Sequence, residues 1–213
     1  VATGAVTLIG PIAGLPHDDV NFFFYEVWGM SYSFFDGNMY VTASASDGLT
    51  IKWTMGSIDL TTGVYTQLFA GEGPWLDGLC MYSPWEPGKA TIEIYTTATG
   101  DDPYPLNFYR ITGDPNNMLI DLGDMGIPGY PNWGSGMEHD RATDRILHAR
   151  RYDDGTKINA VLSTLWDVDK TTGAMTPITD FTSYNGAFSF VTAIATPNDS
   201  PWTAVDDWML INE

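Results

Sequence analysis

Cysteine, positive charge and long apolar runs are all scarce in this chain of 213 residues. Cys80 is the only cysteine, so no disulfide can form within the chain. Cysteine usage therefore does not indicate whether the protein works in an oxidising or a reducing compartment. Its apolar surroundings predict a buried side chain rather than a nucleophile. No apolar run approaches the roughly 18 residues that a membrane-spanning helix needs, so membrane insertion is not expected. Helical periodicity is also missing, which favours an all-β chain.

Lys and Arg number 9 against 27 acidic residues, which gives a formal net charge of −18. Phosphate binding needs clustered positive charge, so nucleic acid is not an expected partner. The acidity is typical of a solvated surface on a secreted or salt-exposed protein, and it could also hold a divalent cation such as Ca²⁺. The chain begins with Val, which is compatible with a processed, exported protein or with a fragment. We expect an extracellular, cell-surface or periplasmic location.

Turn signals between short apolar stretches are abundant, with 22 Gly and 13 Pro. Residues 57–68 and 166–178 share one pattern, in which apolar residues alternate on both sides of a Thr-Thr-Gly turn. This pattern predicts a β-hairpin, because the glycine tolerates the positive φ that a tight turn needs. Residues 108–122 carry a looser copy. A fourth copy would form if residues 208–213 paired with residues 1–9.

A second marker of the repeat is a glycine that opens a strand after each hairpin: Gly29, Gly78, Gly136 and Gly186. Their similar spacing divides the chain into four units, and a repeat that closes across the chain ends indicates a ring. We therefore predict a single all-β domain over residues 1–213, a four-bladed β-propeller whose last blade is closed by the N-terminal strand. The expected blades are 29–70, 78–123, 136–179, and 186–213 plus 1–9.

The two matching hairpins contain Ile58-Asp-Leu-Thr-Thr-Gly63 and Val168-Asp-Lys-Thr-Thr-Gly173. In this turn the chain resembles bacterial blades of the β-propeller repeat superfamily. The resemblance covers the whole chain through its repeats and implies the propeller fold. It implies no particular chemistry, because this fold carries many functions.

In an up-and-down blade, the loops that enter the inner strand and the loops between strands two and three share one face. The entering loops place an aromatic side chain before each marker glycine: Trp28, Trp75, Trp133 and Tyr184. The other loops are acidic in every unit: Asp47, Asp101, Asp102, Asp153, Asp154 and Asp199. Aromatic rings beside carboxylates can hold a sugar, and convergent carboxylates can hold Ca²⁺. A purely structural explanation of these residues stays open, because Asp often caps turns and bulky aromatic side chains often fill the contacts between blades.

Two histidines adjoin carboxylates, in Pro16-His-Asp-Asp19 and in Glu138-His-Asp140. Such groups can bind a transition metal or transfer protons. Neighbours in a strand point to opposite faces, however, which argues against one ligand set around His139. His148 lies between apolar residues and is expected to pack inside a strand. Motifs for a nucleophile elbow, a zinc helix or a phosphate loop are missing from the sequence.

These patterns lead to the hypothesis of a non-enzymatic binding or assembly module whose aromatic and acidic face takes a glycan, a protein ligand or Ca²⁺. Two alternatives stay open. The chain could be a structural subunit of a filament or surface layer, in which a terminal strand pairs with another copy. It could also be a propeller hydrolase or lyase that uses acidic residues, although no carboxylate pair stands out.

Overall fold

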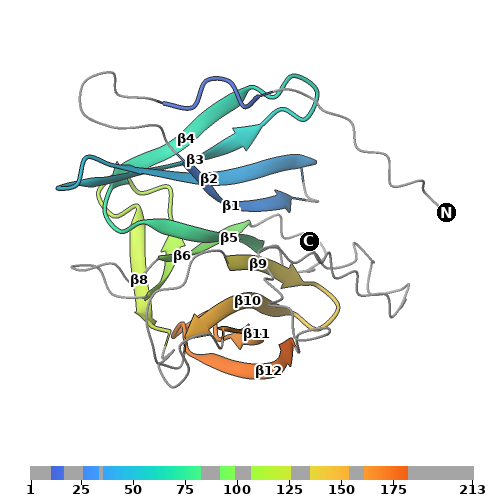
Figure 1. The fold of residues 1–213 in the computed structure, drawn as a ribbon. Helices are drawn as coiled ribbons and strands as arrows, with labels where there is room; N and C mark the ends of the chain where they lie inside the picture. The colour runs from blue at the N-terminus through green and yellow to red at the C-terminus, as the bar shows by residue number, and fades with distance from the viewer. Residues whose placement is uncertain are drawn as a thin grey trace.

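The computed structural model describes residues 11–16, 26–33, 36–82, 92–98, 107–125, 135–153 and 161–181. Within them the chain forms three four-stranded antiparallel sheets, each a meander in chain order (Figure 1). The first sheet contains β1 (Glu26–Ser33), β2 (Asn38–Ser46), β3 (Ile51–Ile58) and β4 (Tyr65–Glu72). The second contains β5 (Leu76–Tyr82), β6 (Glu93–Ala98), β7 (Asn107–Ile111) and β8 (Leu119–Asp124). The third contains β9 (Ser135–Asp140), β10 (Arg145–Asp153), β11 (Val161–Val168) and β12 (Met175–Phe181).

The predicted all-β class is confirmed, but the predicted four-bladed β-propeller closed by the N-terminal strand is wrong. The described residues form three separate sheets, and no sheet among them is closed. The expected units 29–70, 78–123 and 136–179 each coincide with one of these sheets. The expected fourth unit, 186–213 plus 1–9, lies outside the described residues. A repeat period encodes hairpins, which form locally, whereas ring closure depends on contacts between units that the period does not encode. A helix that could cross a membrane is likewise not found in the described ranges.

The two matching hairpin turns share one set of hydrogen bonds. In the first, Asp59 Oδ1 accepts from the backbone N–H of Thr61 at 2.7 Å and of Thr62 at 2.9 Å. The N–H of Gly63 donates to the Asp59 carbonyl at 2.8 Å, with φ of +73°. The turn at 169–173 repeats these three bonds at 2.8, 3.0 and 2.8 Å, with φ of +71° at its glycine. The sequences match because aspartate caps this turn and glycine supplies its positive φ.

The first and second sheets meet closely at the marker glycine of β1. A Cβ atom on Gly29 would lie 2.5 Å from Thr42 Oγ1 and 2.6 Å from the carbonyl oxygen of Asp77 in β5. Near the other end of β5, the N–H of Met81 donates to Ser31 Oγ at 3.1 Å. The backbones of β1 and β5 therefore approach each other at a point where a side chain would not fit.

Side chains alternate along β5, which lies in the middle of the molecule and packs on β1 and β2 as well as on β9. One face contributes to the core shared with the first sheet: Tyr40, Trp53, Met55, Leu76, Leu79, Met81 and Ile111. The other contributes to the core shared with the third sheet: Cys80, Tyr82, Tyr95, Phe108, Met125, Met137, Ile146 and Val168. Cys80 and His148 are fully buried, as predicted.

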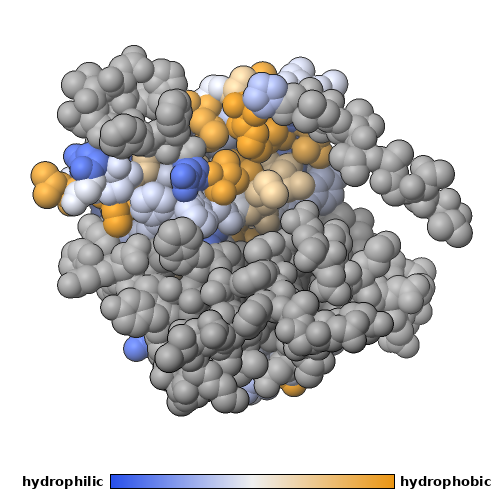
Figure 2. All heavy atoms as spheres, viewed as in Figure 1, coloured by the Kyte–Doolittle hydropathy of each residue, from blue (hydrophilic) through white to orange (hydrophobic). Residues whose placement is uncertain are grey.

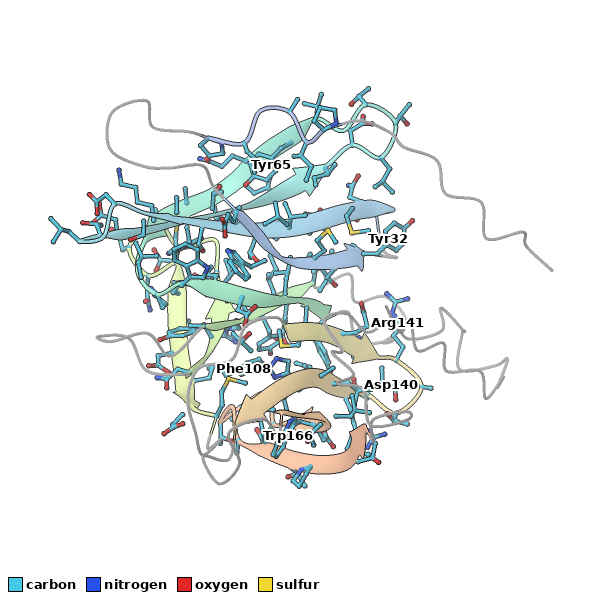
Figure 3. The ribbon with its side chains drawn as sticks, viewed as in Figure 1. Tyr32, Tyr65, Phe108, Asp140, Arg141 and Trp166 are labelled. Atoms are coloured by element: carbon cyan, nitrogen blue, oxygen red, sulfur yellow. The ribbon has the colours of Figure 1, made fainter. Side chains whose placement is uncertain are left out.

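A third, smaller core lies on the far face of the first sheet. It contains Val41, Ile58 and Tyr65, with Leu15 packed against them. The N–H of Tyr65 donates to the carbonyl of Ala13 at 2.7 Å, and Figure 3 shows Tyr65 beside the segment 11–16. This segment therefore covers part of the face that the second sheet does not cover.

Candidate functional site

Two of the predicted aromatic residues meet at the junction of the first two sheets. Trp28 lies in β1, and Trp75 directly precedes β5. Their ring centroids are 5.9 Å apart at an interplanar angle of 76°, an edge-to-face contact, and both side chains are half-buried. We call Trp28 and Trp75 the tryptophan pair. The other two predicted aromatics, Trp133 and Tyr184, lie outside the described residues.

The predicted acidic residue Asp47 lies at the same end of the first sheet as Trp28. β2 ends at Ser46, and β1 begins at this end, because the two strands are antiparallel. Asp47 Oδ1 accepts from the N–H of Thr50 at 2.7 Å and of Leu49 at 2.8 Å, and these bonds hold the pKa of Asp47 below its usual value. This carboxylate caps its own turn, so the structural explanation holds for it.

The described structure leaves the other predicted metal ligands untested. Asp153 is the last residue of β10. The other four lie outside the described residues: Asp101, Asp102, Asp154 and Asp199. Over the described ranges, no group of three or more His, Cys, Asp or Glu side chains is placed to hold a metal ion. Binding of Ca²⁺ therefore stays a prediction.

At the opposite end of the sheets, four polar side chains meet across the seam between the second and third sheets. We call Tyr82, His139, Asp144 and Lys170 the seam cluster. The hydroxyl of Tyr82 donates to Asp144 Oδ1 at 2.7 Å. Lys170 Nζ donates to the Tyr82 hydroxyl and lies 4.1 Å from the centroid of its ring. One tyrosine from β5 therefore makes contact with two turns of the third sheet.

The ring of His139 packs against the ring of Tyr82. Its ring centroid is 4.2 Å from that of Tyr82, and its Nε2 is 3.2 Å from Asp144 Oδ1. Burial lowers the pKa of His139 below its usual value, and this effect outweighs the attraction of the Asp144 carboxylate. The ring is therefore neutral at pH 7. Since a carboxylate only accepts, Nε2 carries the hydrogen and donates it to Asp144.

Asp144 has a φ of +54°, which is rare for a residue other than glycine. Partial burial raises its pKa, but hydrogen bonds from Tyr82 and His139 and the charge of Lys170 outweigh burial and hold the pKa below its usual value. Burial and the Asp144 carboxylate together raise the pKa of Tyr82. The phenol therefore stays protonated at neutral pH and cannot act there as a base.

The triplet at 138–140 does not form one ligand set, in agreement with the strand argument. Glu138 is 9% exposed on the other face of β9 from His139, and burial raises the pKa of Glu138 to about 7. Asp140 accepts a hydrogen bond from the hydroxyl of Thr143 and so stabilises the turn that follows β9. Figure 3 shows Asp140 and Arg141 at this end of β9.

Three members of the seam cluster, Tyr82, Asp144 and Lys170, are missing from the candidates that the sequence suggested. One signal was present, because Lys170 occupies the position that Leu60 holds in the matching turn. Leu60 is 43% exposed, whereas Lys170 reaches Tyr82 in another sheet. Alignment of the two repeats therefore marks Lys170 as the unusual residue.

No protein-family model and no curated protein matches this chain. The resemblance to propeller blades therefore rests on the sequence pattern alone. Any function has to be argued from the described side chains.

Proposed function

We propose that this protein is an extracellular binding module whose ligand contacts the tryptophan pair. The observation that carries the proposal is the edge-to-face contact of Trp28 and Trp75, with ring centroids 5.9 Å apart and both rings half-buried. Aromatic rings that are partly buried in a fixed orientation offer a hydrophobic surface at low entropic cost. The apolar face of a sugar ring fits such a surface.

Asp47 supplies a polar group at the same end of the sheet. Both hydrogen bonds that it accepts in its own turn go to Oδ1. Among the described residues, no hydrogen bond to its Oδ2 is found, so this oxygen can accept from a ligand hydroxyl. The net charge of −18 disfavours an anionic ligand. The class that fits best is therefore a neutral glycan.

The experiment is isothermal titration of the protein with a panel of neutral oligosaccharides, such as xylohexaose, cellohexaose and maltohexaose. We expect at least one to bind, and we expect Trp28→Ala and Trp75→Ala each to lower its affinity about tenfold or more. The matched control is Trp166→Phe, because Trp166 is a half-buried tryptophan in the third sheet. Equal affinity of the wild type and both alanine variants would exclude the tryptophan pair as the site.

Assembly of copies through sheet edges is the second candidate. Among the described strands, β4, β8 and β12 each pair with one strand only, although the segment 11–16 bonds to the first residue of β4. Leu68 in β4 is 48% exposed and Ile178 in β12 is 42% exposed. Figure 2 also shows hydrophobic residues gathered over the first sheet on the face in view. Open edges with exposed apolar side chains favour pairing between chains.

Light scattering tests this second candidate. Assembly through β4 predicts particles larger than a monomer that shrink in a Leu68→Lys variant, since a charged edge resists pairing. A wild-type particle with the mass of one chain, 23.4 kDa, would exclude assembly and leave the binding proposal intact.

A further inference from the structure

A pocket of about 260 Å³ opens beside the seam cluster, between the β9–β10 turn and the β11–β12 turn. It lies at the opposite end of the sheets from the tryptophan pair. Ile146 and Val168 also line it, but their side chains, 1% and 3% exposed, belong to the core shared with the second sheet. The other walls are charged, with two cations and three carboxylates: Arg145, Lys170, Asp144, Asp167 and Asp169.

The two basic side chains of the pocket have N–H groups that can still donate hydrogen bonds to a ligand. Arg145 Nη1 is 3.7 Å from Asp167 Oδ2, and its Nη2 is 3.9 Å from Asp140 Oδ2. Both distances exceed those of hydrogen bonds, so these nitrogens can still donate to another oxygen. The Nε atom of Arg145 donates to Thr143 Oγ1 at 2.8 Å, which orients the guanidinium group. Lys170 carries two further N–H groups besides the one that Tyr82 accepts.

The carboxylates of the pocket keep acceptors in the same way. Asp144 receives its bonds from Tyr82 and His139 on Oδ1. Asp169 receives two backbone N–H groups of its own turn on Oδ1, at 2.8 and 3.0 Å. Among the described residues, no hydrogen bond to Oδ2 of Asp144 is found. The Asp144 carboxylate is therefore fixed by one oxygen and can accept from a ligand with the other, whereas the Asp169 carboxylate also interacts with the side chains of Thr171 and Thr172.

We propose that this pocket binds a small zwitterion of the amino-acid class, with the ligand carboxylate on Arg145 and Lys170 and the ligand ammonium group on the aspartates. The pocket carries charges of both signs, so a ligand with a single charge can pair with only one kind of group. A zwitterion can pair with both kinds at once.

The internal repeat makes this pocket testable without damage to the fold. The turn at 59–63 has the backbone hydrogen bonds of the turn at 169–173, with Leu60 in place of Lys170. Lys170→Leu gives the third sheet a turn that the first sheet already forms. This variant is therefore expected to fold, and it removes one of the two cations.

The experiment is a titration followed by ¹H–¹⁵N NMR, with glycine, L-alanine and L-valine as the zwitterions. Acetate and ethylamine, which carry one charge each, are the control ligands. We expect the zwitterions to shift the backbone amides of 144–146 and 167–171, and the control ligands to bind about tenfold more weakly or not at all. Lys170→Leu and Arg145→Gln should each weaken zwitterion binding about tenfold or more, since each removes a charged hydrogen bond. Leu60→Ala should leave it unchanged.

Three results would overturn the proposal: no shifts at millimolar zwitterion, equal shifts from acetate or ethylamine alone, or undiminished binding by both charge variants. The tryptophan pair lies at the other end of the sheets, so failure at this pocket leaves the glycan proposal standing. If no glycan binds, the amide shifts at this pocket can still be measured, and they still test the zwitterion proposal.

Discussion

Glu138 and His139 respond to pH with opposite effects on stability. Burial raises the pKa of Glu138 from 4.5 to about 7, so its contribution to stability is complete below pH 4.5 and is lost as the pH rises through about 7. Burial lowers the pKa of His139 below 6.5, so its contribution is present above pH 6.5 and is lost as the pH falls through the folded-state pKa. Rising pH therefore lowers stability through Glu138 and raises it through His139.

Glu138→Gln removes the first of these effects. At pH 8 we expect the variant to be more stable than the wild type by up to about 3 kcal/mol, because it no longer buries a charge. At pH 4.5 the carboxyl is protonated in the folded protein, so the difference should nearly vanish. Urea unfolding at both pH values measures it, with Glu72→Gln on an exposed side chain as the control. The same difference at both pH values would contradict the burial argument.

Lys170→Leu tests the seam cluster as a stabilising contact. The variant loses a hydrogen bond to Tyr82 and the position of a cation 4.1 Å from its ring centroid. We expect a loss of about 1 kcal/mol in the free energy of unfolding. Leu60→Lys, the reverse exchange in the matching turn, should change it by less than about 0.5 kcal/mol. A stability equal to that of the wild type would show that the contact contributes nothing.

Residue-scale predictions succeeded where the immediate neighbours in the sequence decide the environment. Cys80 and His148 are buried because their strands are apolar on both sides of them. The contact of Lys170 with Tyr82 joins residues 88 positions apart. It depends on how two sheets stack, which no local pattern encodes.

At the scale of elements, the Thr-Thr-Gly hairpins repeat in conformation but differ in what they touch. A Cβ atom on Gly173 would lie 2.7 Å from Phe108 Cβ in the second sheet. On Gly63 the nearest atom would be the carbonyl oxygen of Pro11 at 3.0 Å. The third sheet's hairpin is therefore also part of the core contact between two sheets.

Gly63→Ala and Gly173→Ala form a matched pair. Both place a side chain at positive φ, which costs about 1 to 2 kcal/mol. Gly173→Ala also forces its Cβ against Phe108, so we expect it to lose at least about 1 kcal/mol more than Gly63→Ala. Thermal or urea unfolding of the two variants measures the difference. Equal losses would mean that the hairpin can move away from the second sheet without cost.

Strand positions could be predicted closely, because hairpins are specified by alternation and by turn residues within a few positions. The expected unit 29–70 contains β1 to β4, which run from Glu26 to Glu72. β1 begins three residues before the expected start of this unit. Its first residues pair with β2 ahead of the marker glycine.

At the scale of the whole molecule, three of the units expected from the sequence coincide with sheets, but the expected closed architecture is wrong. Equal spacing of marker glycines suggested a ring, whereas the described strands form three open sheets. Of the aromatic and acidic face, the structure brings together Trp28 and Trp75, with Asp47 at the same end. The seam cluster lies at the opposite end, and His139 is its one member among the candidates from the sequence.

The most direct test of the central claim is NMR of the tryptophan indole N–H groups during addition of a neutral oligosaccharide that binds. We predict that the indole signals of Trp28 and Trp75, assigned from Trp28→Phe and Trp75→Phe variants, shift in step with binding. The signal of Trp166, which lies in the third sheet, should stay in place. Saturable binding that leaves both signals of the pair unmoved would contradict the proposed function.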